Sequence, residues 1–292
     1  MVPTSADFAA LAATHDIIRL GIRADDVRRQ HHGTKTTFVR VSEVGASPDS
    51  PVRWAAAAGE VRIAGVPESL VAAIERVRHV ASKLRPSGSR ALSGFSLADL
   101  EQLAGRERVT LRALLEDLRG AGLELVAEAP VDALTDPRRS IEEVNIAGLV
   151  LARLTVHRLP SPDPLPLLEG VATLQRAVGV IRAFAPLPRA INPAVPTTGY
   201  DDLKRVALAR LMVEVPSIQV DWSLYGSKLA QVALTMGADD VDGVSADDEA
   251  VDAETQMPLG RRRAPLEEIR RNIRAAGQEP IERNGRFEWR TV

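Results

Sequence analysis

The fold is decided by the stretch Ser217-Ile-Gln-Val-Asp-Trp222, Ser223-Leu-Tyr-Gly-Ser-Lys-Leu-Ala-Gln-Val-Ala-Leu-Thr-Met236 and Gly237-Ala-Asp-Asp-Val-Asp-Gly243. In its first part, Ile218 and Val220 alternate with polar residues, as in a β-strand. In its second part, apolar residues recur at helical spacing, and Gly237 follows where a helix C-cap belongs. The third part begins another extended segment. A strand, a helix of this length and a second strand indicate a right-handed parallel crossover unit.

The same alternation of extended and helical patterns continues along the rest of the chain. Six more strands are predicted from β-branched, aromatic or alternating residues, in residues 36–42, 60–65, 89–95, 123–129, 146–157 and 180–187. Helices are predicted in residues 7–31, 67–84, 110–120, 201–213 and 265–276, and from Ser96, with Asp99 at the capping-box position. Asn284-Gly285 suits the type I′ turn of a hairpin over residues 280–290. The polar segment 247–259 is predicted to be mobile.

Eight strands that alternate with helices predict an α/β fold, a (β/α)8 TIM-type barrel that is closed or slightly open. We expect one barrel domain over residues 1–292. Its parts are an N-terminal helix in 1–34, the barrel strands and helices in 35–245, and a loop, a last helix and a hairpin in 246–292. The 292 residues, 45% of them hydrophobic, suffice for one such barrel, which typically takes about 250 residues.

Charge and hydropathy argue against several classes of partner. The formal net charge is -2 at pH 7, so no basic field indicates nucleic acid. No apolar run reaches the ~20 residues that a membrane span needs. The first residues lack the basic and apolar regions of a signal peptide, so a cytoplasmic location is expected.

The chain contains no cysteine. This excludes disulfides, thiolate zinc sites and cysteine nucleophiles. It also excludes an iron–sulfur cluster held by cysteine ligands. The adjacent pair His31-His32 is a poor metal site as well, because adjacent residues on a helix do not face the same way. We therefore expect no metal and no iron–sulfur cofactor.

Several motifs resemble one enzyme family. The run Ile218-Gln-Val-Asp-Trp222, with Gly226, Lys228-Leu-Ala-Gln231 and Gly237-Ala-Asp-Asp240, is similar to the C-terminal part of the barrel of aminofutalosine synthase, dehypoxanthine futalosine cyclase and FO-synthase-type enzymes. The resemblance covers most of the chain and is strongest over residues 198–286. It implies a radical-SAM-type barrel and a link to menaquinone or deazaflavin biosynthesis.

The chain departs from this family where the family's cofactors bind. In the relatives, the first strand leads into a loop with three cysteines spaced C-x-x-x-C-x-x-C. Here the chain continues Glu43-Val-Gly-Ala-Ser-Pro-Asp-Ser-Pro51. The relatives also have a glycine-rich segment with a glutamate that helps hold SAM. Ala127-Glu-Ala-Pro130 keeps Glu128 without the glycines that allow close backbone approach. The sequence therefore does not favour SAM binding.

Ligands of such barrels meet the C-terminal ends of the strands, so polar residues there are the candidate site. We predict as acid/base residues His157, Glu128 and Asp221, because a histidine titrates near neutral pH and a desolvated carboxylate can act as a general base. We predict as ligand-binding residues Arg40, Ser42, Ser93, Arg189, Asn192 and Trp222. Thr155 and Asp242 lie at strand ends too. Arg40 and Arg189 could bind a carboxylate or phosphate through paired hydrogen bonds.

Each of these residues also has a structural interpretation. Asp221 precedes a helix and could cap it or pair with an arginine. A tryptophan such as Trp222 is more often a core residue than a stacking platform. His157 beside a proline-rich loop is more often structural than catalytic, and a salt bridge explains Glu128 equally well. The arginines could also balance surface acids.

Two classes of function stay open. The first is a cluster-less relative of aminofutalosine synthase without radical-SAM activity. It would be a component of a futalosine-type menaquinone pathway that binds a small anionic or nucleoside-like molecule, or an active radical-SAM enzyme of that pathway as partner. The second is an enzyme with metal-independent acid/base chemistry, of lyase or hydrolase type, that uses His157 with Glu128 or Asp221. Whether the chain is an enzyme stays open.

Overall fold

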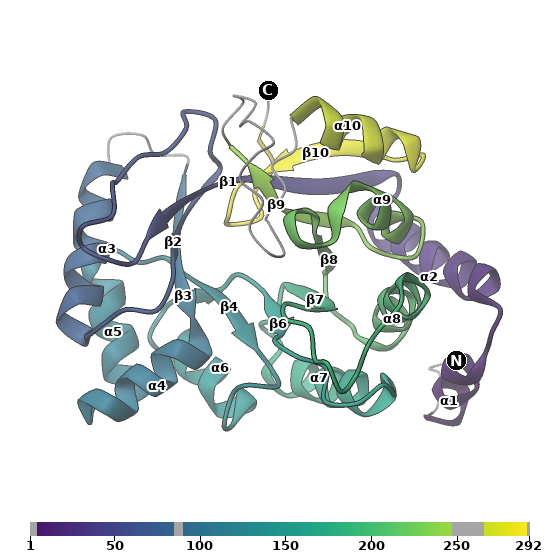
Figure 1. Cartoon of the computed structure of the whole chain (residues 1–292), viewed down its shortest axis with the longest axis horizontal. Coiled ribbons are helices and arrows are strands. Elements are labelled where there is room, and N and C mark those ends of the chain that lie inside the picture. The colour runs from purple at the N-terminus through teal and green to yellow at the C-terminus, as the bar shows by residue number, and fades with distance from the viewer. Residues whose placement is uncertain (1–4, 85–89, 247–265, 291–292) are drawn as a thin grey trace.

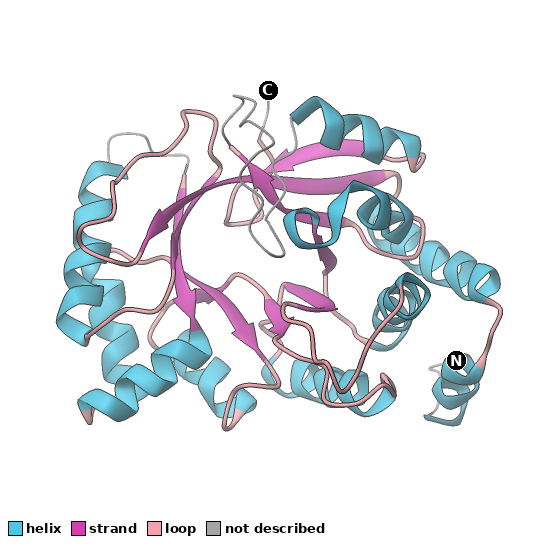
Figure 2. Cartoon of the chain, in the orientation of Figure 1, coloured by secondary structure: helices cyan, strands magenta, loops and turns pink. Residues whose placement is uncertain are grey.

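Parallel strands form the wall of a closed barrel in the computed structural model, which describes residues 5–84, 90–246 and 266–290. Figure 1 shows these strands as a ring, and Figure 2 shows the helices outside it. The wall consists of β1 (Lys35–Gly45), β2 (Glu60–Ala64), β3 (Ala91–Ser96), β4 (Leu125–Pro130), β5 (Val150–Leu151), β6 (Leu154–Val156), β7 (Ala183–Pro188), β8 (Ser217–Asp221) and β9 (Asp240–Ser245). The pairing of β9 with β1 closes the ring, so the predicted (β/α)8 barrel is confirmed in its closed form.

Two short strands share one position in this wall. β5 pairs with the start of β4 at Leu125 and Val126, whereas β6 pairs with the end of β4 at Ala129 and Pro130. The single strand predicted over residues 146–157 is therefore interrupted. The barrel nevertheless has eight strand positions in the described residues, as predicted.

Helices connect the strands and cover the outside of the barrel (Figure 2). They are α1 (Ser5–Ala13), α2 (Ile17–His32), α3 (Leu70–Leu84), α4 (Leu97–Glu107), α5 (Leu111–Ala121), α6 (Pro137–Ile146), α7 (Leu165–Val178), α8 (Gly199–Met212), α9 (Trp222–Leu234) and α10 (Leu266–Ala275). Leucine, valine and isoleucine side chains from these helices and from the strands form one large buried cluster. Burial of this apolar surface is the main driving force for folding.

The stretch that predicted the fold forms β8, α9 and β9. Asp221 caps α9, because its side chain accepts a hydrogen bond from the backbone N–H of Leu224. Gly226 interrupts the helix with φ 75° and ψ 168°, a conformation that only glycine adopts readily. Gly237, at φ 100°, follows the helix and turns the chain into β9.

Some helix predictions are corrected by local capping. Residues 7–31 do not form one helix, because Asp16 accepts a hydrogen bond from the backbone N–H of Arg19 and starts a second helix there. Helices α6 and α7 are absent from the predictions made from the sequence pattern. Asp136 caps α6 and Pro137 occupies its first turn, a pattern that does indicate a helix start. The segment 247–259 lies outside the described residues.

The C-terminal segment joins the barrel, where the sequence predicts a separate hairpin. Strand β10 (Glu279–Arg283) pairs in parallel with the first half of β1. The chain then turns back, and an antiparallel bridge links Arg283 to Trp289. The predicted type I′ turn is wrong, because it needs positive φ at Asn284 and Gly285 and the positive φ occurs at Phe287 instead. Asn284 holds the turn by accepting hydrogen bonds from the N–H groups of Arg286 and Glu288.

Candidate functional site

Charged side chains occupy the centre of the barrel. Asp242 on β9 accepts two hydrogen bonds from Arg62 on β2, at 3.0 and 3.2 Å. It also lies 2.6 Å from a guanidinium nitrogen of Arg153, which lies between β5 and β6. Neither β2 nor β6 is next to β9 in the wall, so these contacts cross the barrel interior. TIM-barrel interiors are dominated by branched apolar residues, and an ionic centre of this kind is unusual.

The same network continues toward β3. Arg62 donates a hydrogen bond of 2.8 Å to Glu60, and Ser93 donates one of 2.6 Å to the same carboxylate oxygen. Ser93, a predicted ligand-binding residue, is fully buried and holds Glu60.

Arg189 connects two of the three predicted acid/base residues. It follows β7, and its Nε lies 2.9 Å from Glu128 of β4 while its Nη1 donates a 2.8 Å hydrogen bond to Asp221 of β8. All three residues stand at the C-terminal ends of their strands, where barrel ligands bind. The second oxygen of Asp221 accepts hydrogen bonds from the Ser223 hydroxyl and the Leu224 N–H. Asp221 is thus both a helix cap and an arginine partner.

The arginines keep these carboxylates ionised. Burial raises the pKa of Glu128, but the charges of Arg189, Arg153 and Arg62 outweigh it, so the pKa lies below its ordinary value. The pKa of Asp221 is lowered in the same way, with Arg189 as the main opposing charge. A carboxylate held ionised by a fixed cation is a weak proton acceptor. The pKa of Asp242 is shifted in the same direction. Burial raises it, but Arg153 and Arg62 lower it well below the usual range.

Asp99 is a further acid at the mouth. It lies in the first turn of α4, and no hydrogen bond to its side chain is present in the described part of the chain. Burial and the charge of Glu128 raise its pKa, and His157 lowers it, so all three groups lie within electrostatic range. The predicted capping box is wrong, because the Ser96 side chain makes no capping bond.

His157 is exposed at the end of β6. Its backbone N–H donates a 2.6 Å hydrogen bond to Asp132. The charge of His157 acts on Asp99, and Asp221 is linked to Glu128 through Arg189.

The other predicted ligand-binding residues have structural partners. Arg40 donates to Glu282 of β10 at 3.0 Å, and the Ser42 hydroxyl accepts from the backbone N–H of Ala55. Asn192 donates to the carbonyl of Leu159. Trp222 is only 1% exposed and packs in the core, so neither face of its ring lies open.

Sequence reasoning did not single out Arg62, Arg153 or Asp99 as site residues. A signal for the arginines exists, since Glu60-Val-Arg-Ile and Arg153-Leu-Thr-Val alternate charged or polar residues with apolar ones. In a strand that alternation places every second side chain on one face. Only the closed barrel shows that the polar face is the inner one.

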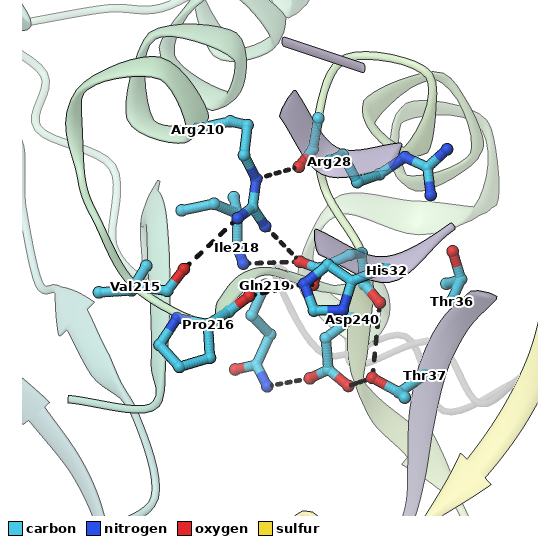
Figure 3. A network of polar contacts seen from close by, with 12 residues as sticks. Arg28, His32, Thr36, Thr37, Arg210, Val215, Pro216, Ile218, Gln219 and Asp240 are labelled. Atoms are coloured by element: carbon cyan, nitrogen blue, oxygen red, sulfur yellow. Dashed lines mark hydrogen bonds and ion pairs between the residues drawn. The ribbon is translucent and has the colours of Figure 1, made fainter. Parts of the chain in front are cut away.

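A second polar layer lies toward the N-terminal ends of the strands. Asp240 accepts hydrogen bonds from Arg283, Gln219 and Thr37, with distances of 2.5 to 2.7 Å. Figure 3 shows Gln219, Asp240 and Thr37 beside a neighbouring group around His32 and Arg210. In TIM barrels this end serves stability rather than catalysis.

No group of three histidine, cysteine, aspartate or glutamate side chains in residues 5–84, 90–246 and 266–290 is placed to hold a metal ion. No helix within these ranges has the length and apolar character needed to cross a membrane.

A cavity of about 300 Å³ opens at the opposite end of the barrel, between α6, α7 and the residues before β7 and β8. The predicted site residues do not line this cavity.

The fold and the polar mouth define a closed (β/α)8 barrel with its candidate site at the C-terminal ends of the strands. The structure is similar to that of methylornithine synthase PylB, with a TM-score of 0.67 over 95% of this chain and 94% of that one. The sequence identity is 14%, so this likeness concerns the fold alone.

Sequence comparison finds relatives of this chain. Residues 187–292 match the family model described as the CofH/MqnC C-terminal region. The chain is 26% identical over 236 residues to 5-amino-6-(D-ribitylamino)uracil--L-tyrosine 4-hydroxyphenyl transferase of Archaeoglobus fulgidus, covering 72% of this chain and 66% of the relative. It is 27% identical over 224 residues to aminodeoxyfutalosine synthase of Thermus thermophilus, covering 67% of this chain and 59% of the relative. The chain is a divergent relative of these enzymes, which confirms the resemblance, and the match spans under two thirds of their length.

Proposed function

We propose that this protein is a cluster-less relative of aminofutalosine synthase that binds a small anionic or nucleoside-like molecule in its barrel mouth. Its place would be in a futalosine-type menaquinone pathway. The observation that carries the proposal is the retention of the family barrel in a chain without a single cysteine. Thiolate ligands for a four-iron cluster are absent from this sequence, while arginines stand at the mouth where a ligand would meet the strand ends.

The loop after β1 supports the loss of the cluster. This is the place where the resemblance puts three cysteines, and here the loop has contacts of its own. Ala55 donates its N–H to Ser42, and Val52 and Trp54 pack against the main hydrophobic cluster. Reconstitution with iron and sulfide under anaerobic conditions is expected to give no four-iron absorption spectrum, and such a spectrum would contradict the proposal.

A thermal-shift experiment tests ligand binding by the full chain. The compounds are SAM, 5′-deoxyadenosine, aminofutalosine, futalosine and carboxyvinyloxybenzoate. A ligand at 100 times its Kd adds about 2.7 kcal/mol to the free energy of unfolding, so at least one futalosine-type compound should raise the Tm. Arg189→Lys should weaken the shift, because lysine cannot make paired hydrogen bonds. Arg112→Gln, far from the mouth on α5, is the control. No shift with any compound would contradict ligand binding and favour a partner-binding role.

The alternative is an enzyme with metal-independent acid/base chemistry, of lyase or hydrolase type. One observation favours it, namely that Asp99 has a raised pKa beside His157 and Glu128. In this alternative, Asp99 with His157 would transfer the proton more readily than Glu128 or Asp221, because Arg189 holds both of those carboxylates ionised. Turnover that is lost in both Asp99→Asn and His157→Gln would support it over simple binding.

A further inference from the structure

The cavity between α6 and α7 lies at the end of the barrel opposite the mouth (Figure 1). Its volume is about 300 Å³, at the lower end of the range of small-molecule pockets. Val150, Val180 and Pro216 line it and are partly or fully exposed, so the cavity presents apolar side chains. The candidate site in the mouth uses none of these residues, and the cavity is therefore a separate feature of the molecule.

One wall of the cavity is held in place by hydrogen bonds. The side-chain amide of Gln175 on α7 donates to the carbonyls of Ile181 and Glu214, at 3.3 and 3.2 Å, and accepts a 3.1 Å hydrogen bond from the Ile181 N–H. The carbonyl of Arg182 accepts a hydrogen bond from the N–H of Ser217, the first residue of β8. The segment before β7 is thus fixed to α7 and to β8, so a ligand would meet a preformed wall.

Among the described residues, one charged side chain lines the cavity, and it is a cation. Arg182 is exposed, and its Nη1 donates a 3.1 Å hydrogen bond to the carbonyl of Arg286. No other hydrogen bond or ion pair of its guanidinium is present within residues 5–84, 90–246 and 266–290. Glu124, an acid beside Arg286, is already bound by that arginine at 2.7 Å. The Nε and Nη2 edge of Arg182 therefore offers two donors that match a carboxylate.

An apolar surface beside a single cation fits an aliphatic acid. The valine and proline side chains favour CH₂ groups, because removal of apolar surface from water drives their association. The guanidinium edge favours a carboxylate, which it can bind through two parallel hydrogen bonds. No acidic side chain in the described part of the chain lines the cavity to repel that group. At the ~30 Å³ that a water molecule takes in the liquid, the cavity holds about ten non-hydrogen atoms, as many as in octanoate.

We propose that this cavity binds a short-chain aliphatic monocarboxylic acid. The carboxylate accepts hydrogen bonds from Nε and Nη2 of Arg182, and the chain lies along Val150, Val180 and Pro216. This site is independent of the proposed function, because it shares no residue with the mouth.

Calorimetric titration of the full chain with butanoate, hexanoate, octanoate and decanoate tests the site. The Kd should fall about fourfold with each added CH₂ up to octanoate, as burial of a methylene predicts, and should then stop falling because the cavity is full. Octanol keeps the chain without the carboxylate, so it should bind at least about tenfold more weakly than octanoate. Absence of binding by all four acids, or equal binding of octanol and octanoate, would overturn the proposal.

Arg182→Gln tests the position of the carboxylate. Arg182 is exposed, so the variant should keep nearly the Tm of the wild type. Its Kd for octanoate should rise at least about tenfold and approach that of octanol. Arg176→Gln, on the exposed face of α7 and outside the cavity lining, is the matched control and should bind octanoate as the wild type does. An unchanged Kd in Arg182→Gln would overturn the proposal.

Asn145→Trp tests the position of the chain. Asn145 is exposed on α6 and lines the cavity, so a tryptophan there can fill the opening without disturbing the core. Octanoate binding should be lost in this variant. Thr173→Trp, exposed on α7 and outside the lining, is the control and should leave binding intact. Undiminished binding in Asn145→Trp would show that the acid does not occupy this cavity.

The mouth also contains arginines, so Arg189→Lys shows which end of the barrel binds the acid. Octanoate should bind this variant as it binds the wild type. Affinity that is lost in Arg189→Lys and kept in Arg182→Gln would place the acid at the mouth and overturn the proposal. If octanoate binds at Arg182 but no futalosine-type compound raises the Tm, the proposed function alone is wrong.

Discussion

At the residue scale, the structure shows how one buried aspartate can organise a site. Asp242 is the shared partner of Arg62 and Arg153, and its carboxylate is fully buried. A buried ion pair is no more stabilising than apolar residues of the same shape, since desolvation opposes the attraction. Removing one partner, however, leaves the others charged and unpaired.

Asp242→Asn should therefore lower the free energy of unfolding by about 3–5 kcal/mol, because two guanidiniums lose their main counter-charge. Urea unfolding followed by circular dichroism measures this. Glu143→Gln, which breaks the surface pair with Arg112 on α5, is the control and should cost far less. A loss in Asp242→Asn no larger than in the control would show that the central network is not needed for stability.

At the element scale, α9 depends on a backbone conformation that the side-chain pattern does not show. The apolar spacing from Leu224 to Met236 predicts one continuous helix. Gly226 instead breaks it after the first turn, with φ 75° and ψ 168°. The helix therefore consists of a first turn and a second segment that begins after Gly226. Asp221 caps the first turn at the barrel mouth.

Gly226→Ala should destabilise the protein by about 1–3 kcal/mol, because alanine is strained in this conformation. Gly170→Ala is the matched control. Gly170 lies exposed in α7 without a positive φ, and nothing lies within 4 Å of an added Cβ, so alanine should stabilise by about 0.5–1 kcal/mol. Both values come from denaturant midpoints. A Gly226→Ala variant as stable as the Gly170→Ala variant would contradict this account.

At the scale of the whole molecule, a charged cluster joins four elements at the N-terminal end of the barrel (Figure 3). His32, the last residue of α2, has its Nε2 2.6 Å from Asp239, just before β9, and 2.7 Å from the carbonyl of Pro216, just before β8. Asp239 also accepts hydrogen bonds from Arg210 of α8 and from the backbone N–H of Ile218. The cluster therefore holds α2 and α8 to the starts of β8 and β9.

This cluster should make stability depend on pH. Burial and Arg210 lower the pKa of His32, but Asp239 and the Pro216 carbonyl raise it more, so the folded-state pKa lies above 6.5. The protonated form is thus stabilised in the folded state. Its contribution is present below the unfolded pKa and is lost as the pH rises through the folded pKa.

The free energy of unfolding of the wild type should therefore exceed that of His32→Gln more at pH 5.5 than at pH 8.5. Urea unfolding at both pH values measures the difference. His79→Gln, on the exposed face of α3, controls for the loss of a surface histidine. A difference that stays constant or grows toward pH 8.5 would contradict the role of protonated His32.

Much of the fold follows from local pattern. The alternation around Ile218 and Val220 and the glycine after Met236 predict β8, α9 and β9, and eight strand positions are found as predicted. The predictions fail where a cap divides a pattern, as Asp16 does between α1 and α2, and where a turn is set by side-chain hydrogen bonds, as at Asn284. In each case a single local contact outweighs propensity.

The candidate site is less predictable. Glu128, Arg189 and Asp221 stand at strand ends, so the rule for barrel ligands selects them, and the structure brings them together. That rule does not select Arg62 and Arg153. A charged residue in an extended segment is ordinarily expected to face solvent, so the sequence gives no reason to place them inside the barrel. Trp222 satisfies the rule by position, but it points into the core.

By itself, the sequence determined the eight strand positions of the barrel and their order, the kinship with the futalosine-type enzymes, and the absence of cysteine ligands for a cluster. These properties depend on composition, on periodicity and on motifs of neighbouring residues. The tertiary structure decided which charges meet. Arg62 and Asp242 are 180 residues apart in the chain, and they bind only because closure of the barrel turns both strands' polar faces inward. A contact between residues so far apart in the chain depends on the topology of the barrel. A local sequence pattern does not carry that information.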